Sequence, residues 1–337
     1  MKWYDKTGNG HDVVISSRIR LARNLDEFPF TTKLDNASSK KVADKVVEAL
    51  KENLDKNLKV TEMNSLSQNK NVLVEDHVIS PDFTTETSLE RVLVTDEEEN
   101  LSIMINEEDH VRIQAIFSGF ELDMAYEEAC RADDALSKSL SLAFDDTLGY
   151  LTACPTNLGT GLRASVMLHL PAMCAYGYIK SLSALMTKIG LTVRGIYGEG
   201  SDAEACMYQL SNQVTLGISE TDAIEKLKNA VNQIVAKERE LRSQMVKDPS
   251  ISLQDKLWRS YGTLKYARKL DTTEAARLIS NVRLGVVCGI INECKDVNLV
   301  KLLFEIMPYH IADKFPDAIS PEKRDIYRAS FIREQLS

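Results

Sequence analysis

"VVISSRIRLAR", residues 13–23, reads as an extended strand that carries three arginines. Side chains alternate along a strand, so Arg18 and Arg20 share one face while Ile19 and Leu21 share the other. Two neighbouring guanidinium groups repel each other unless an anion lies between them. A solvated basic edge strand fits the same pattern, so the strand predicts an anion site only if other segments supply further parts of it.

The composition excludes several classes of protein. The chain has 337 residues, enough for about two domains, and 50 acidic against 41 basic residues give a net charge of −9. We therefore expect no direct binding of nucleic acid and no membrane partner. The first 12 residues lack a long apolar core, and no segment approaches the roughly 18 apolar residues of a membrane helix, so we expect a cytoplasmic protein.

The cysteines and glycines offer no familiar cofactor motif. The six cysteines include no C-x-x-C pair and no zinc-type spacing with histidine, so we expect reduced thiols and no metal ligands from the protein. Neither a Walker A sequence nor a strand followed by G-x-G-x-x-G is present. Any nucleotide must be held by other means.

Hydrophobic periodicity predicts an antiparallel sheet flanked by helices in the first part of the chain, an α+β fold. Alternation predicts strands at 91–95, 101–109, 110–117, 149–153, 164–170, 191–197 and 207–214. Helical spacing predicts helices at 37–57, with serines available as caps, at 122–144, and from Ser219 toward residue 247.

The last part of the chain has only helical patterns, over 253–270, 273–291, 298–307 and 322–336. Asp248-Pro249 marks a break before them. We therefore expect a catalytic-type domain at 1–248 and an all-α C-terminal domain at 249–337.

Three further stretches carry groups suited to chemistry. "NEEDHVR", residues 106–112, ends an apolar strand, and alternation predicts that Glu108 and His110 share one face. "CPTNLGTGLRAS", residues 154–165, is a tight loop that begins with Cys154, a thiol that cationic neighbours would favour as thiolate. "RGIYGEGSDAEA", residues 194–205, is a glycine-rich acidic loop of the kind that closes over sites. Taken singly, each also fits a plain turn.

Five motifs in order resemble the phosphagen (ATP:guanidino) kinases, the family of creatine and arginine kinases, with the bacterial protein-arginine kinases as the most similar branch. They are S-S-R-x-R, N-E-E-D-H-x-R, C-P-T-N-L-G-T-G-x-R, R-G-x-x-G-E and S-N-x-x-x-L-G-x-S-E, between Val13 and Glu220.

The resemblance implies a phosphagen-kinase-like catalytic domain in which arginines surround the phosphates of ATP, with Mg²⁺ bridging those phosphates. Such a cage suits phosphoryl transfer, where charge spreads over the transferred oxygens. The implied nucleotide contacts are Ser16, Ser17, Arg18, Ile19, Arg20, His77, Arg112, Arg163, Ala164, Ser165, Val166, Met167, Arg194, Gly195, Ile196, Tyr197, Gly198 and Glu199. For His77, a surface turn is an equal alternative.

The resemblance also implies the catalytic groups. Glu108 would orient the guanidinium and accept its proton, Glu199 would hold its other side, and Cys154 would supply a thiolate close to it. Creatine-type kinases carry a small helical domain before S-S-R-x-R, and only 15 residues precede Ser16 here. We therefore expect that domain to be missing and the site to admit an arginine on a protein surface.

"RDIYRA", residues 324–329, matches an allosteric phosphoarginine pocket of the bacterial branch, which implies roles for Arg324, Asp325, Arg328 and Ala329. Residues four apart share a helix face, so Arg324 and Arg328 would face one anion; an ordinary charged helix face is the alternative. The resemblance further implies a homodimer, a stress-linked role in protein quality control, and as partners an activator protein, a transcription repressor and a Clp-type protease.

Three functions follow from these residues. The first is a protein-arginine kinase, ATP + protein L-arginine = ADP + protein Nω-phospho-L-arginine. The second is a kinase for free arginine or another small guanidino compound. The third is a non-catalytic phosphoarginine- or nucleotide-binding regulator.

Overall fold

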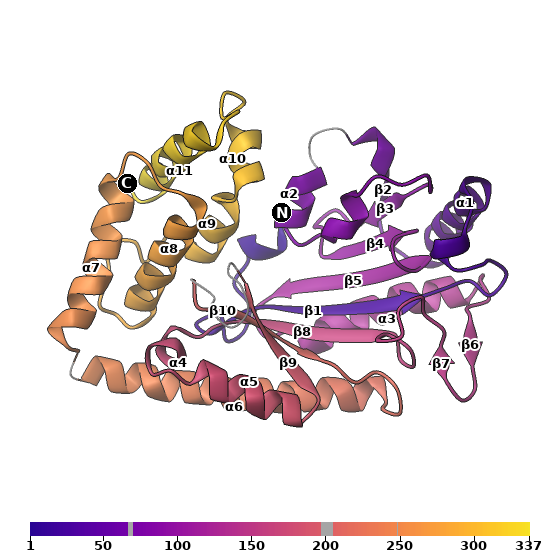
Figure 1. Cartoon of the computed structure of the whole chain (residues 1–337), viewed down its shortest axis with the longest axis horizontal. Coiled ribbons are helices and arrows are strands. Elements are labelled where there is room, and N and C mark those ends of the chain that lie inside the picture. Colours follow the sequence, from indigo (N-terminus) through magenta and orange to yellow (C-terminus); the bar gives the residue numbers. More distant parts are fainter. Residues whose placement is uncertain (67–69, 197–204, 248) are drawn as a thin grey trace. The chain divides into compact units, whose positions relative to one another are not determined.

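The computed structural model describes residues 1–66, 70–196, 205–247 and 249–337. Eight strands form one sheet (Figure 1). In their order across the sheet they are β2 (Lys59–Glu62), β3 (Val92–Thr95), β4 (Leu101–Ile105), β5 (Val111–Ser118), β1 (Val14–Arg23), β8 (Leu162–His169), β10 (Met207–Asn212) and β9 (Leu191–Ile196). A separate hairpin pairs β6 (Phe144–Asp145) with β7 (Gly149–Tyr150).

The sheet is antiparallel where its pairing is resolved, as the alternating sequence pattern predicts. β1 lies against β5 with Arg20 opposite Gln114 and Ala22 opposite Arg112, and β2, β3, β4 and β5 pair in succession. β1, which opens the sequence argument, is thus an internal strand with neighbours on both sides. An internal position excludes the alternative of a solvated edge strand.

The chain divides into two compact units, each built from several separate stretches of sequence. The first comprises Met1–Asn9, Ser16–Val166 and Ser211–Asn229, and the second comprises Gly10–Ile15, Met167–Leu210 and Ala230–Ser337. The first unit contains α1 (Asn36–Asn53), α2 (Lys70–Glu75) and α3 (Leu122–Ser137). α6 (Glu220–Lys247) begins in the first unit and continues in the second. The predicted domain boundary falls at Asp248, outside the described residues, and stays a prediction.

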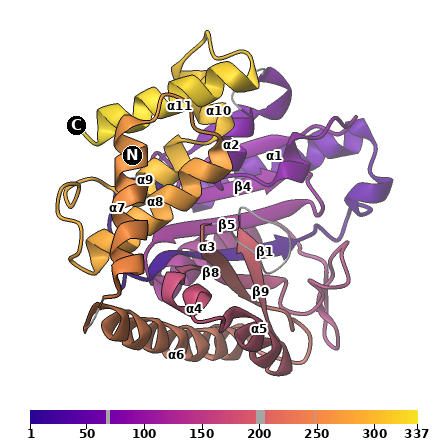
Figure 2. The same cartoon turned by 60° about the vertical axis from the view of Figure 1, so that its left-hand side comes forward.

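The second unit holds most of the helices (Figures 1 and 2). They are α4 (Pro171–Ala175), α5 (Ile179–Lys188), α7 (Ile251–Tyr266), α8 (Thr272–Val287), α9 (Leu299–Glu305), α10 (Pro308–Lys314) and α11 (Pro321–Gln335). α7 packs against α8 and α11, and α8 against α9. The predicted helical character of the C-terminal region is confirmed.

Several predicted boundaries are wrong. The predicted helix at 122–144 ends at Ser137, because the backbone beyond it pairs elsewhere: Ser141 O accepts from Asp26 N, and Ala143 N donates to Asn24 O. The predicted strand at 149–153 shortens to the two residues of β7. The first helix is capped not by a serine but by Asp35, whose carboxylate accepts from Ser38 N at 2.7 Å.

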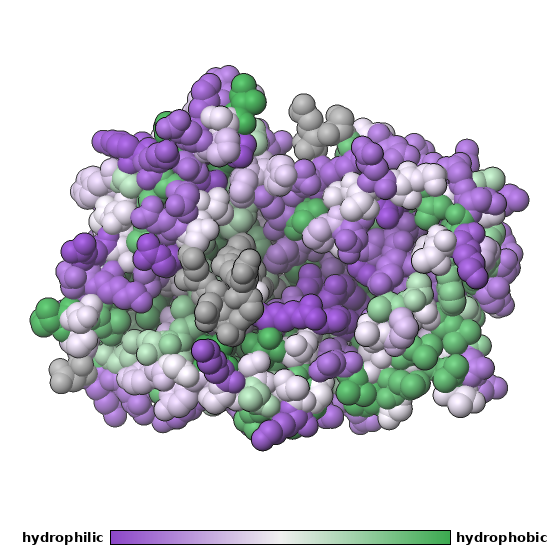
Figure 3. Space-filling model, in the orientation of Figure 1, coloured by the Kyte–Doolittle hydropathy of each residue, from purple (hydrophilic) through white to green (hydrophobic). Residues whose placement is uncertain are grey.

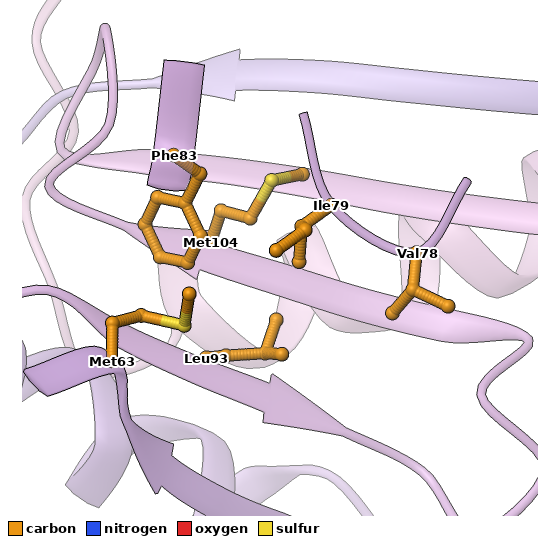
Figure 4. Packing of buried hydrophobic residues seen from close by; sticks show 6 residues of the cluster. All are labelled: Met63, Val78, Ile79, Phe83, Leu93 and Met104. Atoms are coloured by element: carbon orange, nitrogen blue, oxygen red, sulfur yellow. The ribbon is translucent and has the colours of Figure 1, made fainter. Parts of the chain in front are cut away.

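An apolar cluster fixes the segment around residues 77–83 on the sheet (Figure 4). Leu93 of β3 and Met104 of β4 point from the strands toward Val78, Ile79 and Phe83. Each of these side chains is almost fully buried, and burying one contributes roughly 1.5–3 kcal/mol. The cluster therefore sets the place of the adjacent His77.

In the second unit, a buried carboxylate joins α6 to α4. Glu238 accepts from the backbone N–H groups of Ala172 (3.0 Å) and Met173 (2.9 Å), the first turn of α4, and from Arg242 Nε (2.7 Å). The Glu238 side chain is fully buried. It supplies the negative charge that a helix N-terminus and a buried arginine both require.

Glu238→Ala should lower the free energy of unfolding by about 3 kcal/mol, because it leaves Arg242 buried without its counter-charge. Denaturant unfolding measures this. Glu240→Ala is the matched control on the same helix: its exposed pair with Lys237 should contribute less than about 0.5 kcal/mol. Equal losses in the two variants would refute the role of Glu238.

Candidate active site

Four arginines gather on one face of the sheet in the first unit. Arg18 and Arg20 lie on β1, Arg112 on β5 and Arg163 on β8. Arg18, Arg20 and Ala22 are every second residue of β1, so their side chains lie on the same face of the sheet. Arg112 is directly opposite Ala22 on β5, so its side chain lies on that face too. Arg163 donates from Nη2 to Ser211 Oγ at 3.2 Å.

The arginines perturb one another. Burial, together with the charges of Arg163 and Arg112, lowers the pKa of Arg18 to about 10. Burial and the three neighbouring guanidinium groups hold the pKa of Arg20 well below its usual range, and Glu107 opposes them. Arg20 Nε is buried without a hydrogen-bond partner. Buried donors and uncompensated positive charge are what a polyanion such as a nucleotide phosphate chain relieves.

Glu107 is a buried group that the sequence pattern did not single out. Its carboxylate accepts from Arg112 Nη1 at 2.8 Å, from the Ser80 hydroxyl, and from Glu108 N at 3.0 Å. Arg112 also donates from Nη2 to Glu108 Oε2 at 3.0 Å. Glu107 thus holds Arg112 in place. One feature of the sequence could have revealed Glu107: it follows the apolar strand that ends at Ile105, and Arg112 comes five residues after it.

The predicted alternation through residues 106–110 is wrong. β4 ends at Ile105, Asn106 takes a positive φ of 60°, and Asn106 N bonds to His110 O in a tight turn. His110 is therefore buried instead of sharing a face with Glu108. Of the acidic groups in the turn, only Glu108 is exposed, with 42% of its side chain accessible.

Asp109 connects this turn to the cysteine loop. Asp109 Oδ1 accepts from Ala153 N and from Asn24 Nδ2, each at 2.6 Å. Asn24 also accepts from His110 N at 2.9 Å and donates to Leu151 O at 3.0 Å. These buried bonds hold Ala153 next to Asp109. They therefore hold the loop of Cys154 close to the turn of Glu108.

Glu108 and Cys154 are therefore neighbours. Cys154 Sγ lies 3.0 Å from Thr156 Oγ1. Partial burial raises the pKa of Glu108, as do the charges of Asp109 and Glu107, against the opposing effects of Arg112 and Cys154. A raised pKa suits a carboxylate that accepts a proton.

His77 borders the arginines from the segment above the sheet. Its φ is 60°, a left-handed conformation that is rare outside glycine, and its ring stacks on Trp3. Burial, then the charge of Arg18, lowers the pKa of His77 to about 3, so the ring is neutral near pH 7. His77 lies in a turn and is half-buried beside the arginines, and its contact with a nucleotide stays a prediction.

Other predicted contacts have structural partners. The Ser17 hydroxyl donates to Gly119 O at 2.9 Å and accepts from Glu121 N at 3.0 Å, so its side chain serves the start of α3. Ala164 N donates to Asn212 Oδ1. The remaining buried side chains of this set belong to Ser16, Ile19, Ala164, Ser165, Val166 and Met167.

The predicted loop residues are only partly described. Arg194 and Gly195 lie on β9 in the second unit, with Arg194 exposed. Ile196 ends this strand, and nothing is described of its side chain. Tyr197, Gly198 and Glu199 lie outside the described residues, so their predicted roles remain predictions.

The "RDIYRA" stretch lies on α11 beside a pocket of about 730 Å³ that Asp271, Arg277, Arg324 and Asp325 help to line. Arg328 is nearly fully buried and donates to Ile306 O (2.7 Å), Leu270 O (2.9 Å) and Asp325 Oδ1 (2.6 Å). Three partners make Arg328 a structural element of the pocket wall. Ala329 is fully buried.

Comparison with known proteins identifies the family of this chain. Residues 41–241 match the sequence model "ATP:guanido phosphotransferase, C-terminal catalytic domain", and residues 250–337 match "Protein-arginine kinase McsB C-terminal domain". The protein-arginine kinase of Brevibacillus brevis is 44% identical over 99% of this chain and 94% of its own length. The protein-arginine kinase of Clostridium kluyveri is 44% identical over 98% of this chain and 96% of its own length.

Two solved structures share the fold. The duplicated taurocyamine kinase from Schistosoma mansoni matches with a TM-score of 0.63 and 28% sequence identity. The match covers 73% of this chain and 37% of the taurocyamine kinase chain. Lombricine kinase has a TM-score of 0.62 and 24% identity over 72% of this chain and 71% of its own. The chain belongs to the ATP:guanido phosphotransferase family.

Arg20→Met should raise the free energy of unfolding by about 1 kcal/mol, because it removes one of several mutually repelling buried charges. The same change should weaken ATP binding at least tenfold. Denaturant unfolding and titration with ATP measure the two effects. Arg259→Met, at a side chain that is 78% exposed, should change neither. A destabilised Arg20→Met variant that binds ATP normally would contradict the assignment.

Proposed function

We infer that this chain is a protein-arginine kinase, which transfers the γ-phosphoryl group of ATP to arginine side chains of proteins. The hydrogen bond from Arg112 to the exposed carboxylate of Glu108, at 3.0 Å, carries this inference, because it places a proton acceptor next to the cluster of four arginines. Similarity to protein-arginine kinases over nearly the full chain supports the choice of substrate.

The reaction assigns a task to each group. A guanidinium nitrogen of the substrate attacks the γ-phosphorus, the bond to the oxygen of ADP breaks, and a proton leaves the nitrogen. Glu108, exposed and with a raised pKa, accepts that proton. Arg18, Arg20, Arg112 and Arg163 hold the phosphates and neutralise the charge on their oxygens.

Mg²⁺ would arrive with the nucleotide. No group of three or more His, Cys, Asp or Glu suited to a metal occurs within residues 1–66, 70–196, 205–247 and 249–337. A cation coordinated chiefly by phosphate oxygens and water, as Mg²⁺ prefers, fits such a site. We propose Cys154 as an assisting thiolate, and Glu199, Arg194 and His77 as further contacts.

We propose the pocket beside α11 as an allosteric phosphoarginine site. Arg324, partly exposed, would pair with the phosphoryl group, and Asp325 would pair with the guanidinium. The further proposals are a homodimer, a cytoplasmic role in the stress response and protein quality control, and an activator protein, a transcription repressor and a Clp-type protease as partners. The described helices include none that is long and apolar enough to cross a membrane.

The central test is direct. Incubation with ATP, Mg²⁺ and an arginine-rich unfolded protein should give acid-labile phosphate that mass spectrometry places on arginine. Free arginine in excess should compete weakly; strong competition would favour a kinase for small guanidino compounds. Phosphoserine, or no incorporated phosphate, would overturn the inference.

Glu108→Gln should lower kcat/KM by about 100-fold to 1,000-fold with ATP affinity nearly unchanged, because it removes only the proton acceptor. Glu107→Gln is the informative comparison, since it releases Arg112 and should weaken ATP binding instead. Turnover by Glu108→Gln within threefold of the parent would exclude Glu108 as the base.

Arg324→Ala should weaken binding of free phosphoarginine about tenfold or more without changing stability, as measured by calorimetric titration and thermal unfolding. Arg259→Ala, at a side chain that is 78% exposed, should leave binding intact. Undiminished binding in Arg324→Ala would remove this pocket from consideration.

A further inference from the structure

Four large apolar side chains of the first unit are exposed on two segments that are both bonded to the loop at Gly159 and Thr160. Phe144 and Leu148, on the β6–β7 hairpin, are 56% and 40% exposed; Val214 and Leu216, just after β10, are 44% and 47% exposed. Figure 3 shows hydrophobic residues gathered over this hairpin, beside the hydrophilic face of the sheet. We call these four residues the apolar platform. Contiguous exposed apolar surface marks a binding surface more often than single exposed residues do.

The platform is joined to the cysteine loop by backbone bonds. Tyr150 N donates to Gly159 O at 2.8 Å, and Thr160 N donates to Thr215 O at 3.0 Å. The Thr215 hydroxyl also bonds to Thr156 O at 3.0 Å. Both segments of the platform therefore border the loop that carries Cys154, and Ala153 at the start of this loop donates to Asp109, the residue after Glu108, at 2.6 Å.

The hairpin is held firmly. The Arg23 guanidinium lies 3.5 Å from the centre of the Tyr150 ring and pairs with Asp133 at 2.7 Å. At the tip, Asp145 Oδ1 accepts from the backbone N–H groups of Thr147 (2.8 Å) and Leu148 (2.9 Å). A surface with a fixed shape loses little entropy when it binds a partner.

We propose that the apolar platform docks hydrophobic residues that flank the target arginine in an extended segment of a protein substrate. This inference rests on the proposed function. An extended chain advances about 3.3 Å per residue. The platform borders the loop next to Glu108, so it offers a surface to residues that flank an arginine bound at Glu108. Asp146 on the hairpin is exposed, and the net charge of −9 also favours a segment that contains basic residues.

Two synthetic peptides test the proposal. Both carry one central arginine and have equal length and charge; one has leucine and phenylalanine at flanking positions, and the other has serine there. The intact protein should show a KM about tenfold lower for the apolar peptide, with similar kcat, as expected for roughly one buried apolar side chain. In the double variant Phe144→Ser, Leu148→Ser, this ratio should fall below twofold while the KM of the serine peptide stays unchanged.

Two further variants complete the design. Val214→Ser, Leu216→Ser, on the second segment, should reproduce the loss of preference, which covers the case in which the hairpin variant fails to fold. Met124→Ser, at a residue 50% exposed on α3, should keep the tenfold ratio.

The outcomes are distinct. Equal KM values for the two peptides in the intact protein, or an unchanged ratio in both platform variants, would overturn the docking proposal while leaving the kinase assignment intact. A change of mass in light scattering without a change in peptide preference would show that a second copy of the chain covers the platform, which also overturns it. Phosphorylation of neither peptide by the intact protein would refute the proposed function, and the docking proposal with it.

Discussion

Repulsion among four guanidinium groups is the constraint around which the first unit is organised. Burial is the largest cause that lowers the pKa of Arg18 and of Arg20, and the neighbouring charges of Arg112 and Arg163 lower both further. A sheet can impose such an arrangement because the register of internal strands is fixed by many backbone bonds and by the apolar residues on the opposite face. The folded first unit therefore favours binding of an anion among these arginines.

The three acidic residues of the turn, at 107–109, differ in burial and therefore in function. Glu107 and Asp109 are buried and hydrogen-bonded. Glu107 holds the Arg112 side chain in place, and Asp109 holds the cysteine loop through Ala153 N. Glu108, between them, keeps an exposed carboxylate with a raised pKa. Three adjacent carboxylates therefore differ in function because a single left-handed residue, Asn106, turns the chain before them.

Much of this was accessible from sequence, and the limits have physical causes. Period-two and helical patterns predicted the antiparallel sheet and the helical C-terminal region, because burial of one face imposes those periods. They failed at residues 106–110 and 138–143, where side-chain and backbone bonds from distant segments override local preference. The ordered motifs predicted the convergence of Arg18, Arg20, Arg112 and Arg163, whereas Glu107 and Asn24 escaped notice because their roles depend on tertiary contacts.

Arg328 and Arg324 are one helical turn apart on α11, yet they are embedded very differently. Both line the same pocket, but Arg328 is nearly fully buried and donates to the carbonyls of Leu270 and Ile306, while Arg324 is partly exposed. A genetic screen for variants blind to a ligand of this pocket would recover changes at Arg324. Changes at Arg328 would disappear from the same screen, because degradation of unfolded protein would remove them before their ligand response could be scored.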